Sequence, residues 1–367
     1  MPKPPLNGSP AEPKTRRRWP IGFSIACLAI AVGGGLLWLR SGPSAPPAIV
    51  HTISYGRALA QAQDGKPGAA RVLYQQFART DLSGPRRAGL LVELSNFPGP
   101  QALKLAGEAL HSDEVLVRQA AIDAIVKLVS GSQRSVLLGP LLDEKEPDTR
   151  FSAAKALLGL TPDEVGLYFT PLEQVVEEYK TALQAKVPAT SQSQLQLARL
   201  YLHTNDPARA ATALEQALAL EPGNLEAALA QIDLLDKQGQ AEKARHLLGQ
   251  LLEHNPSSSM LQHAFGMWLL NHGQSEYALL GLTKAVELDP ENNDFRYDLA
   301  VALHGLEQLE PAQKQLEDIL QRQPANRRSR VLLIHYWQES GQLQKVQVLL
   351  AELEQQNPDD PALQQGL

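Results

Sequence analysis

The chain has 367 residues and a formal net charge of −6, a length that suits two ordinary domains or one long array of repeats. Aromatic residues make up only 5% while Ala, Leu and Gln are plentiful, and this composition favours helices over sheets. The single cysteine, Cys27, excludes an intrachain disulfide and any Cys-x-x-Cys site for zinc, haem or redox chemistry.

A long apolar run lies within residues 16–47, RRRWPIGFSIACLAIAVGGGLLWLRSGPSAPP. Ile21–Leu39 contains no charge, and at about 1.5 Å per residue it would span roughly 28 Å, close to the ~30 Å hydrocarbon core of a bilayer. Trp19 and Trp38 flank it as interfacial aromatics do. The run exceeds the about 7–15 residues of a signal-peptide core, and Pro46 follows its cleavage-like small residues. We therefore expect a retained transmembrane helix over 21–39.

The charges around this run predict its orientation. Lys14 and Arg16 to Arg18 precede it and only Arg40 follows closely, and positive residues stay on the cytoplasmic side. We expect a cytoplasmic tail over 1–20, a linker over 41–50, and all later residues in the periplasm, anchored in a bacterial inner membrane.

The charge of the later residues limits their partners. The first 40 residues hold six Lys or Arg and one Glu, a net charge of +5. Since the whole chain carries −6, the remaining residues carry −11. An acidic ectodomain argues against nucleic acid or anionic lipid as its main partner.

Residues 51–165 show a first helical repeat. DEVLVRQAAIDAIVKLV and PDTRFSAAKALLGL share an acid, a short gap, an arginine and then small residues, and Arg86, Arg118 and Arg150 stand 32 residues apart. This pattern resembles HEAT-type helical pairs. We expect helices in SYGRALAQAQ, GAARVLYQQFAR, RRAGLLVELS, QALKLAGEAL and the two segments above. The arginines are expected to contact acids of neighbouring repeats.

A second repeat, with a period of 34 residues, begins near residue 188. Prolines recur at that spacing at Pro188, Pro222, Pro256, Pro290, Pro324 and Pro358. Small residues keep the same register at Ala210, Ala244, Ala278 and Ala312, and large ones at Leu214, Leu248, Leu282, Leu316 and Leu350. The pattern resembles tetratricopeptide repeats. It predicts five helical hairpins over 191–363, preceded by a half-repeat helix over 172–188.

Together these patterns predict an all-α chain: one N-terminal transmembrane helix followed by an α-solenoid of HEAT-like pairs and a tetratricopeptide superhelix. Small residues let the two helices of a hairpin approach, and large ones fill the space between hairpins. The fifth repeat departs from the pattern, since Val346 replaces the small alanine and Ile334 fills the small first-helix slot. We expect it to act as a cap.

The order of the modules resembles the C-terminal half of certain bacterial multihaem c-type cytochrome proteins, where a HEAT and tetratricopeptide tail follows a haem domain. Here the resemblance covers about 51–360 and the haem domain is missing, since the chain has no Cys-x-x-Cys-His. The resemblance implies a periplasmic module that serves a respiratory or redox complex.

No motif of the chain indicates catalysis. It has no His-Glu-x-x-His, no nucleophile elbow and no phosphate loop, and its acids are spread along helix surfaces. We predict no enzymatic activity, no cofactor and no resident metal.

The register places certain first-helix residues on a concave groove. As partner-binding residues we predict Gln192, Arg199, His203, Asp233, Lys237, His263, Met267, Asn271, Tyr297, His304 and His335. Leu195 is expected on the same face. Histidine and methionine suit a peptide-binding surface, but they also ligate soft metals or haem iron, and a surface without a role is a third interpretation.

The function predicted from sequence is a membrane-anchored periplasmic scaffold or adaptor for protein–protein interaction. Its partners would be multihaem cytochromes or other inner-membrane subunits of a respiratory complex. One alternative is an envelope assembly factor for secretion or polysaccharide export. Another is an electron-transfer accessory that contacts haem or metal, which stoichiometric uptake of haem or copper would favour.

Overall fold

The structure, a computed structural model, describes residues 53–364. The predicted cytoplasmic tail (1–20), transmembrane helix (21–39) and linker (41–50) lie outside the described residues. Among the residues that are described, no helix combines the length and the apolar character that a membrane crossing requires.

The first part of the described chain, residues 53–168, is called the N-terminal arm. Its elements are all helical: α2 (Tyr55–Gln63), α3 (Ala69–Phe77), α4 (Gly84–Leu94), α5 (Pro100–Ala109), α6 (Val115–Leu128), α7 (Gly131–Leu138), the 3-10 helix Gly139–Asp143, α8 (Pro147–Leu157), α9 (Pro162–Val165) and the 3-10 helix Gly166–Tyr168. All six helices expected from sequence are present within a few residues of their expected ends. Helix α7 was not anticipated, because its eight residues are too short for a clear apolar period.

The second part is called the array, residues 191–364, and α10 (Phe169–Gln184) leads into it. The array consists of α11 (Ser191–His203), α12 (Pro207–Leu220), α13 (Leu225–Lys237), α14 (Ala241–His254), α15 (Ser259–Asn271), α16 (Ser275–Leu288), α17 (Asn293–Gly305), α18 (Leu309–Arg322), α19 (Arg327–Glu339), α20 (Leu343–Gln356) and α21 (Pro361–Gln364). The helix expected over 172–188 runs from Phe169 to Gln184 instead. It ends early because the residue before Pro188 is biased away from helical backbone.

Buried small and large residues set the spacing of the array. The four alanines of the 34-residue period are fully buried, and so are the leucines four positions after them: Ala210, Ala244, Ala278, Ala312, Leu214, Leu248, Leu282 and Leu316. Each second helix of a repeat ends two residues before one of the periodic prolines. The predicted hairpin register is therefore confirmed.

In the N-terminal arm, arginines join successive helical pairs. Arg118 donates to the Ser112 carbonyl at 2.6 Å and forms an ion pair with Glu146. Arg150 repeats this geometry 32 residues later, with the Glu144 carbonyl at 2.6 Å and an ion pair with Glu178. The predicted contacts with acids are confirmed at these two positions. Arg86 differs, because its guanidinium lies 5.5 Å from the ring centroid of Tyr55.

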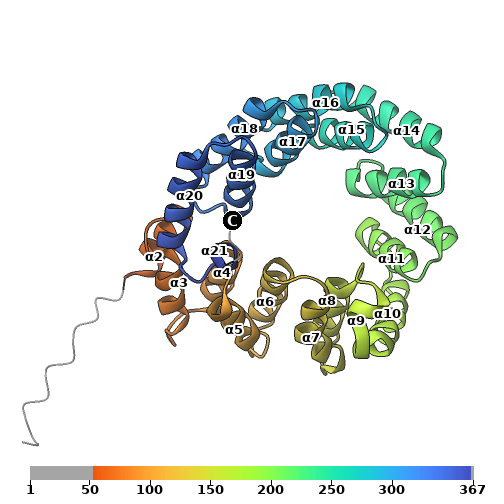
Figure 1. Cartoon of the computed structure of the whole chain (residues 1–367). Helices are drawn as coiled ribbons and strands as arrows, with labels where there is room; N and C mark the ends of the chain where they lie inside the picture. Colours follow the sequence, from red (N-terminus) through yellow and green to blue (C-terminus); the bar gives the residue numbers. More distant parts are fainter. Residues whose placement is uncertain (1–52, 365–367) are drawn as a thin grey trace, which may run out of the picture. The chain divides into compact units, whose positions relative to one another are not determined.

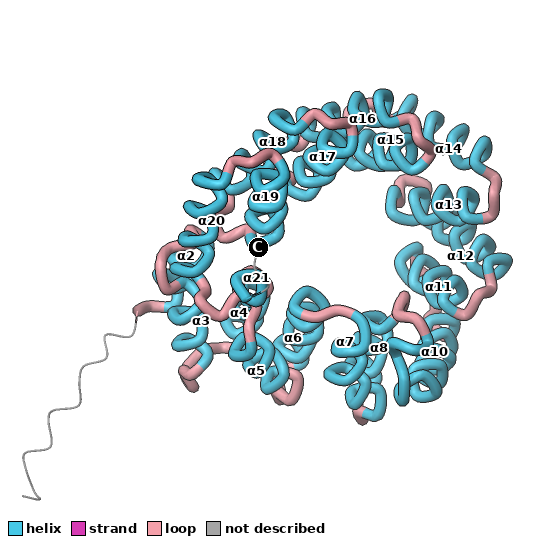
Figure 2. The backbone as a smooth tube through the Cα atoms, in the orientation of Figure 1, coloured by secondary structure: helices cyan, strands magenta, loops and turns pink. Residues whose placement is uncertain are grey.

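Within residues 53–364 the helices are arranged around a common centre (Figures 1 and 2). In the array, the odd-numbered helices α11 to α19 lie on the inner side and the even-numbered helices α12 to α20 on the outer side (Figure 1). The N-terminal arm continues the curve from α10 back to α2.

The curve closes, because the end of the array packs against the start of the arm. The Gly68 amide donates to the Gln355 carbonyl at 2.7 Å, and Asn357 Nδ2 donates to the Pro98 carbonyl at 2.6 Å. Ala325 joins a core cluster with residues of the arm such as Phe97. We call this junction the seam.

Two glycines allow the seam to form. A β-carbon on Gly65 would lie 2.9 Å from the backbone carbonyl of Pro324, and one on Gly99 would lie 3.2 Å from the Asp359 carbonyl oxygen. Gly65 also has a φ of +57°, a conformation that other residues rarely adopt. Backbone thus meets backbone where side chains would hold the two ends apart.

Candidate partner-binding surface on the inner helices

An aromatic ring and a guanidinium form a platform on the inner helices. The Arg328 guanidinium lies 3.7 Å from the ring centroid of Tyr297, and the Arg328 Nη1 atom lies 3.6 Å from Asp294 Oδ1. Asp294 and Arg328 are one 34-residue period apart, so the repeat places them on adjacent helices at equivalent heights. Both charged side chains remain mostly exposed, with 86% and 61% of their surfaces accessible.

This platform lines a cavity of about 930 Å³ that we call the seam cavity. The array provides one part of its lining, including Tyr297, Arg328, Leu332 and His335 from α17 and α19. The N-terminal arm provides the other part, which comprises Val92, Glu93, Ser95, Asn96 and Lys127 from α4, its C-terminal turn and α6. The cavity exists only because the two ends of the described chain meet.

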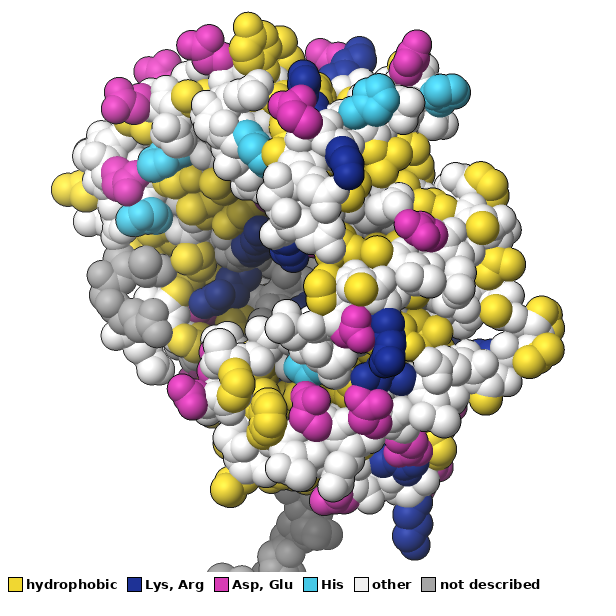
Figure 3. Space-filling view, turned by 90° about the vertical axis from the view of Figure 1, so that its right-hand side faces the viewer, with side chains coloured by type: hydrophobic (Ala, Val, Ile, Leu, Met, Phe, Trp, Pro, Cys, Tyr) yellow, Lys and Arg dark blue, Asp and Glu magenta, His cyan; other side chains and the backbone are white. Residues whose placement is uncertain are grey.

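Cations outnumber anions in the lining of the seam cavity. Arg327 is engaged in a bidentate pair with the buried Asp360, at 2.6 and 2.7 Å. Arg328 and Lys127 remain exposed, and Glu93 accepts a hydrogen bond from Gln63 at 2.9 Å. In Figure 3, Lys and Arg side chains are visible inside the hollow that the helices surround. Asp294 also lines the cavity and pairs with Arg328, so Lys127 is the lining cation that no ion pair of the described residues engages and that can meet an anionic group.

A second, smaller cavity of about 590 Å³ contains two more of the predicted residues. Arg199 and His203 of α11 line it together with Lys155 and Leu158 at the end of α8. Arg199 forms an ion pair with Glu226 on α13. As at the seam, the lining combines residues of the array and of the arm.

Three of the predicted histidines serve as bridges to a neighbouring helical pair. His263 Nε2 lies 2.8 Å from Asp298 Oδ2, His304 Nε2 lies 2.7 Å from Glu339 Oε2, and His203 Nε2 lies 3.0 Å from Glu173 Oε1. Each acid stands on the first helix of an adjacent repeat or on α10. The Nε2 atom of each ring is therefore already engaged by a carboxylate.

Aromatic stacking fixes two of these rings further. His263 stacks on Phe295 with ring centroids 4.5 Å apart, and His304 stacks on Tyr336 with centroids 3.8 Å apart. Burial raises the pKa of Tyr336 to about 12, with Tyr297 and Glu339 adding to the effect. Within residues 53–364, no three His, Cys, Asp or Glu side chains gather as a metal-binding group. His203, His263 and His304 therefore each contact a carboxylate of a neighbouring helical pair.

The remaining predicted residues line neither of the two cavities. Asp233 and Lys237 pair with each other on α13 at 2.8 Å, and Met267 packs against the core. Gln192 and Asn271 are exposed on α11 and α15. Leu195, which we expected on the concave face, is fully buried in the core, because that side of α11 packs against its neighbours.

Sequence reasoning missed the part of both cavities that the arm provides. Val92, Lys127 and Lys155 come from helices whose apolar faces were assigned to packing alone. Nothing in a 34-residue period indicates that the array curves back to α4 and α6. The bridges did leave a signal, since His263 with Asp298 and His304 with Glu339 both stand 35 residues apart, one period plus one.

Comparisons with known proteins agree with the repeat register. Residues 201–264 match the family described as tetratricopeptide repeat. An uncharacterized protein of Sinorhizobium fredii, y4yS, is 31% identical over 93 residues, which are 25% of this chain. The chain spans about half the length of that curated relative, 51%.

Several solved structures match part of the chain at low identity and low TM-score. MamA has 16% identity and a TM-score of 0.37, covering 44% of this chain and 94% of that one. YrrB, described as a TPR protein with an unusual peptide-binding site, has 18% identity and a TM-score of 0.36, covering 52% and 97%. MamA from Desulfovibrio magneticus RS-1 has 19% identity and a TM-score of 0.32, covering 41% and 84%.

Proposed function

We propose that this helical chain with tetratricopeptide repeats is a binding scaffold that holds a segment of a partner protein in the seam cavity. The observation that carries the proposal is the exposed platform of Tyr297 and Arg328 in a cavity of about 930 Å³. Its role is binding rather than catalysis.

The chemistry of the lining suggests the partner's features. Val92, Val331 and Leu332 offer apolar contact, and Lys127 and Arg328 offer two cations within reach of the same cavity. A guanidinium stacked on an aromatic ring directs its N–H groups outward in the guanidinium plane. A carboxylate can accept hydrogen bonds from two of these N–H groups. The preferred segment therefore carries a carboxylate next to a large apolar side chain.

The location and the identity of the partner rest on the sequence. The apolar run over 21–39 and the preceding basic residues support a single anchor in a bacterial inner membrane, with the N-terminus in the cytoplasm and the helices in the periplasm. The HEAT-like pattern of the arm and the order of modules support a partner in a respiratory complex, such as a multihaem cytochrome. The scaffold would assemble or support that complex.

Crosslinked affinity capture of the tagged full-length chain from native membranes, followed by mass spectrometry, tests this function. The wild-type chain is compared with a Tyr297→Ala, Arg328→Ala double variant. A matched control is Asn271→Ala, an exposed residue of the inner helix α15 that lines neither cavity. Circular dichroism checks that all three chains keep their helix content.

The expected result is recovery of cytochrome or other respiratory subunits by the wild type and by Asn271→Ala, with a loss of about tenfold in the double variant. Equal recovery by all three chains would move the binding site off the seam cavity. Recovery of secretion or polysaccharide-export subunits would keep the scaffold and overturn the respiratory assignment.

A further inference from the structure

Three consecutive helices of the array each carry a glycine in their middle. These glycines are Gly249 on α14, Gly266 on α15 and Gly281 on α16. The other four repeats carry larger residues at the equivalent positions, 34, 68 or 102 residues away. For Gly249 these are Glu215, Thr283, Glu317 and Ala351; for Gly266 they are Ala198, Ile232, Ala300 and Ile334; for Gly281 they are Ala213, Leu247, Gln315 and Leu349.

Two of these glycines draw one hairpin together. A β-carbon on Gly281 would lie 3.0 Å from the Gly266 amide nitrogen, and one on Gly266 would lie 2.9 Å from the Leu282 amide nitrogen. Helices α15 and α16 therefore approach more closely than side chains would allow. The apolar core is divided at the same place, since one cluster ends at Ala278 and another begins at Leu282.

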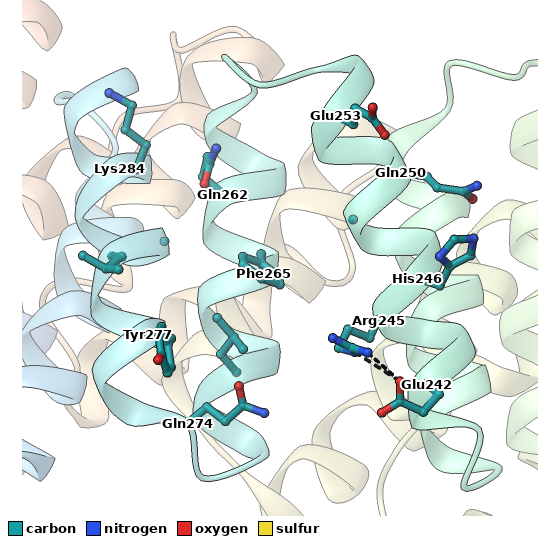
Figure 4. Close-up of a pocket in the computed structure, with 14 residues that line it drawn as sticks. Glu242, Arg245, His246, Gln250, Glu253, Gln262, Phe265, Gln274, Tyr277 and Lys284 are labelled. Carbon is teal, nitrogen blue, oxygen red and sulfur yellow. Dashed lines mark hydrogen bonds and ion pairs between the residues drawn. The ribbon is translucent and has the colours of Figure 1, made fainter.

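The close hairpin leaves a groove between α14 and α16, which we call the outer groove. Its volume is about 910 Å³, and its floor includes Phe265 and Leu269 of α15 (Figure 4). The two flanking helices lie on the outer side of the array, away from the seam cavity (Figure 1). Tyr277 and Leu280 on α16 line it with 65% and 69% of their surfaces exposed. Exposed apolar surface beside a concave apolar floor is typical of a binding site.

Gly249 is not required by the packing of the described residues. A β-carbon there would meet nothing within 4 Å, and glycine inside a helix costs about 0.5–1 kcal/mol relative to alanine. Gly249 lines the outer groove, where the absence of a side chain leaves the α14 backbone accessible. Such a position permits the close approach of a second helix.

We propose that the outer groove binds an amphipathic helix of a partner protein, a second interaction that is independent of the seam cavity. An extended peptide would find no backbone partners, because α14, α15 and α16 use their own amides and carbonyls within their helices. A helix satisfies its own backbone and can place one apolar ridge on Phe265, Leu269 and Leu280. Helices of 14 residues, such as α14 and α16, offer a trough roughly 21 Å long.

Charged residues at the ends of the outer groove define the polar flanks of the bound helix. Lys284 and Glu253 lie at the same end on opposite walls, on α16 and α14 (Figure 4). At the other end, Arg245 and Glu242 pair with each other at 2.7 Å. Lys284 likewise pairs with Glu287 on α16 at 3.0 Å, so the exposed Glu253 is the remaining charge of the groove lining. The bound helix carries a base toward Glu253.

A display library of 18-residue helices supplies the probe. Its members carry randomised large apolar residues at i, i+3, i+4 and i+7, and it is selected against the full-length chain. Selected peptides are then titrated against Gly249→Trp, which fills the outer groove without touching the core. The matched control is Glu215→Trp, the equivalent exposed position of the first repeat.

The expected result is a set of binders that lose affinity by about tenfold or more with Gly249→Trp and keep it with Glu215→Trp. Failure to select any binder, or equal affinity for both variants, overturns the proposal. Sedimentation of the peptide-free chains tests a second copy as the occupant. A wild-type dimer that Gly249→Trp dissociates and Glu215→Trp does not would also overturn it.

Discussion

The seam and the outer groove use glycine to opposite effect. At the seam, Gly65 and Gly99 let backbones from the two ends of the described chain come into contact. At the outer groove, Gly266 and Gly281 draw α15 and α16 together, and the space appears on the other side of α15, toward α14. In both regions the missing β-carbon allows a close backbone contact. Whether a groove remains beside the glycine contact depends on whether another helix is present to fill that space.

This difference explains why one region is closed and the other open. At the seam, Ala325, Phe97 and their neighbours form a continuous apolar cluster across the junction. At the outer groove, the apolar floor ends at solvent, and Leu280 remains exposed. The arm supplies at the seam what a partner helix would supply at the outer groove.

The largest effect is expected from Ala278→Arg, which attacks the hairpin next to the outer groove. Ala278 is fully buried, and its carbonyl oxygen would lie 3.0 Å from a β-carbon on Gly266. A long charged side chain in this contact should destabilise the array by about 4 kcal/mol or more. Urea unfolding followed by circular dichroism measures it. Tyr277→Arg, one residue earlier and exposed, should change little; equal effects of the two would contradict the register.

Gly65→Ala should open the seam. Alanine would have to adopt the left-handed backbone conformation of Gly65, and its β-carbon would collide with the Pro324 carbonyl. Gly68→Ala is a matched control, because Gly68 has a φ of +73° but nothing lies within 4 Å of its β-carbon position. The control should lose about 1–2 kcal/mol from the backbone alone, and Gly65→Ala about 1–3 kcal/mol more.

Hydrogen exchange distinguishes seam opening from a general loss of stability. Gly65→Ala should speed amide exchange in residues 353–360 by tenfold or more relative to Gly68→Ala. A tenfold change corresponds to a loss of about 1.4 kcal/mol of local stability. Matching exchange in the two variants would mean that the contact with Pro324 does not hold the seam closed.

A pair of alanine substitutions at the outer groove should have effects of opposite sign. Gly249→Ala should stabilise the chain by about 0.5–1 kcal/mol, because it improves helix propensity and meets nothing. Gly281→Ala should destabilise it, because its β-carbon would lie 3.0 Å from two backbone atoms of α15. The urea midpoints of both variants measure this. Two changes of the same sign would show that the close hairpin is not the cause of the groove.

The last prediction concerns alkaline pH at the seam. Tyr74 donates to the Phe97 carbonyl at 3.2 Å, and burial raises its pKa from 10.0 to about 12, with Asp359 and Asp360 adding to the shift. The folded chain therefore retains a proton that the unfolded chain releases. The stability that this provides is complete below pH 10 and is lost as the pH rises toward 12.

Tyr74→Phe should accordingly lose less stability between pH 10 and 12 than the wild type. At neutral pH it should be weaker by about 1 kcal/mol, because the hydrogen bond to Phe97 is gone. Urea unfolding at several pH values measures both effects. The exposed Tyr277, changed to Phe, provides the control, and a Tyr74→Phe profile parallel to it would contradict the assignment.

The sequence predicted the local structure of this chain better than its sites. Periodic residues such as Ala278 and Pro290 determine the hairpins, because helix packing and helix ends depend on neighbours within one repeat. Tyr297 and His335, predicted from the repeat register, lie on helices that line the seam cavity. Closure at the seam depends on small rotations accumulated over all repeats, which no single residue reports. For this reason Val92 and Lys127 could not be assigned to the same cavity as Tyr297.

The seam also changes what the ends of a solenoid require. A linear stack of repeats exposes an apolar face at each end and needs polar capping repeats to stay soluble. Here the terminal units of the described chain cap each other. One example is the hydrogen bond from Asn357 to the Pro98 carbonyl, which joins residues that are 259 positions apart in the sequence. Removing α2 and α3 would therefore uncover the end of α20, although the deletion lies at the opposite end of the described chain. Truncation from either side should therefore expose an apolar helix end and favour aggregation.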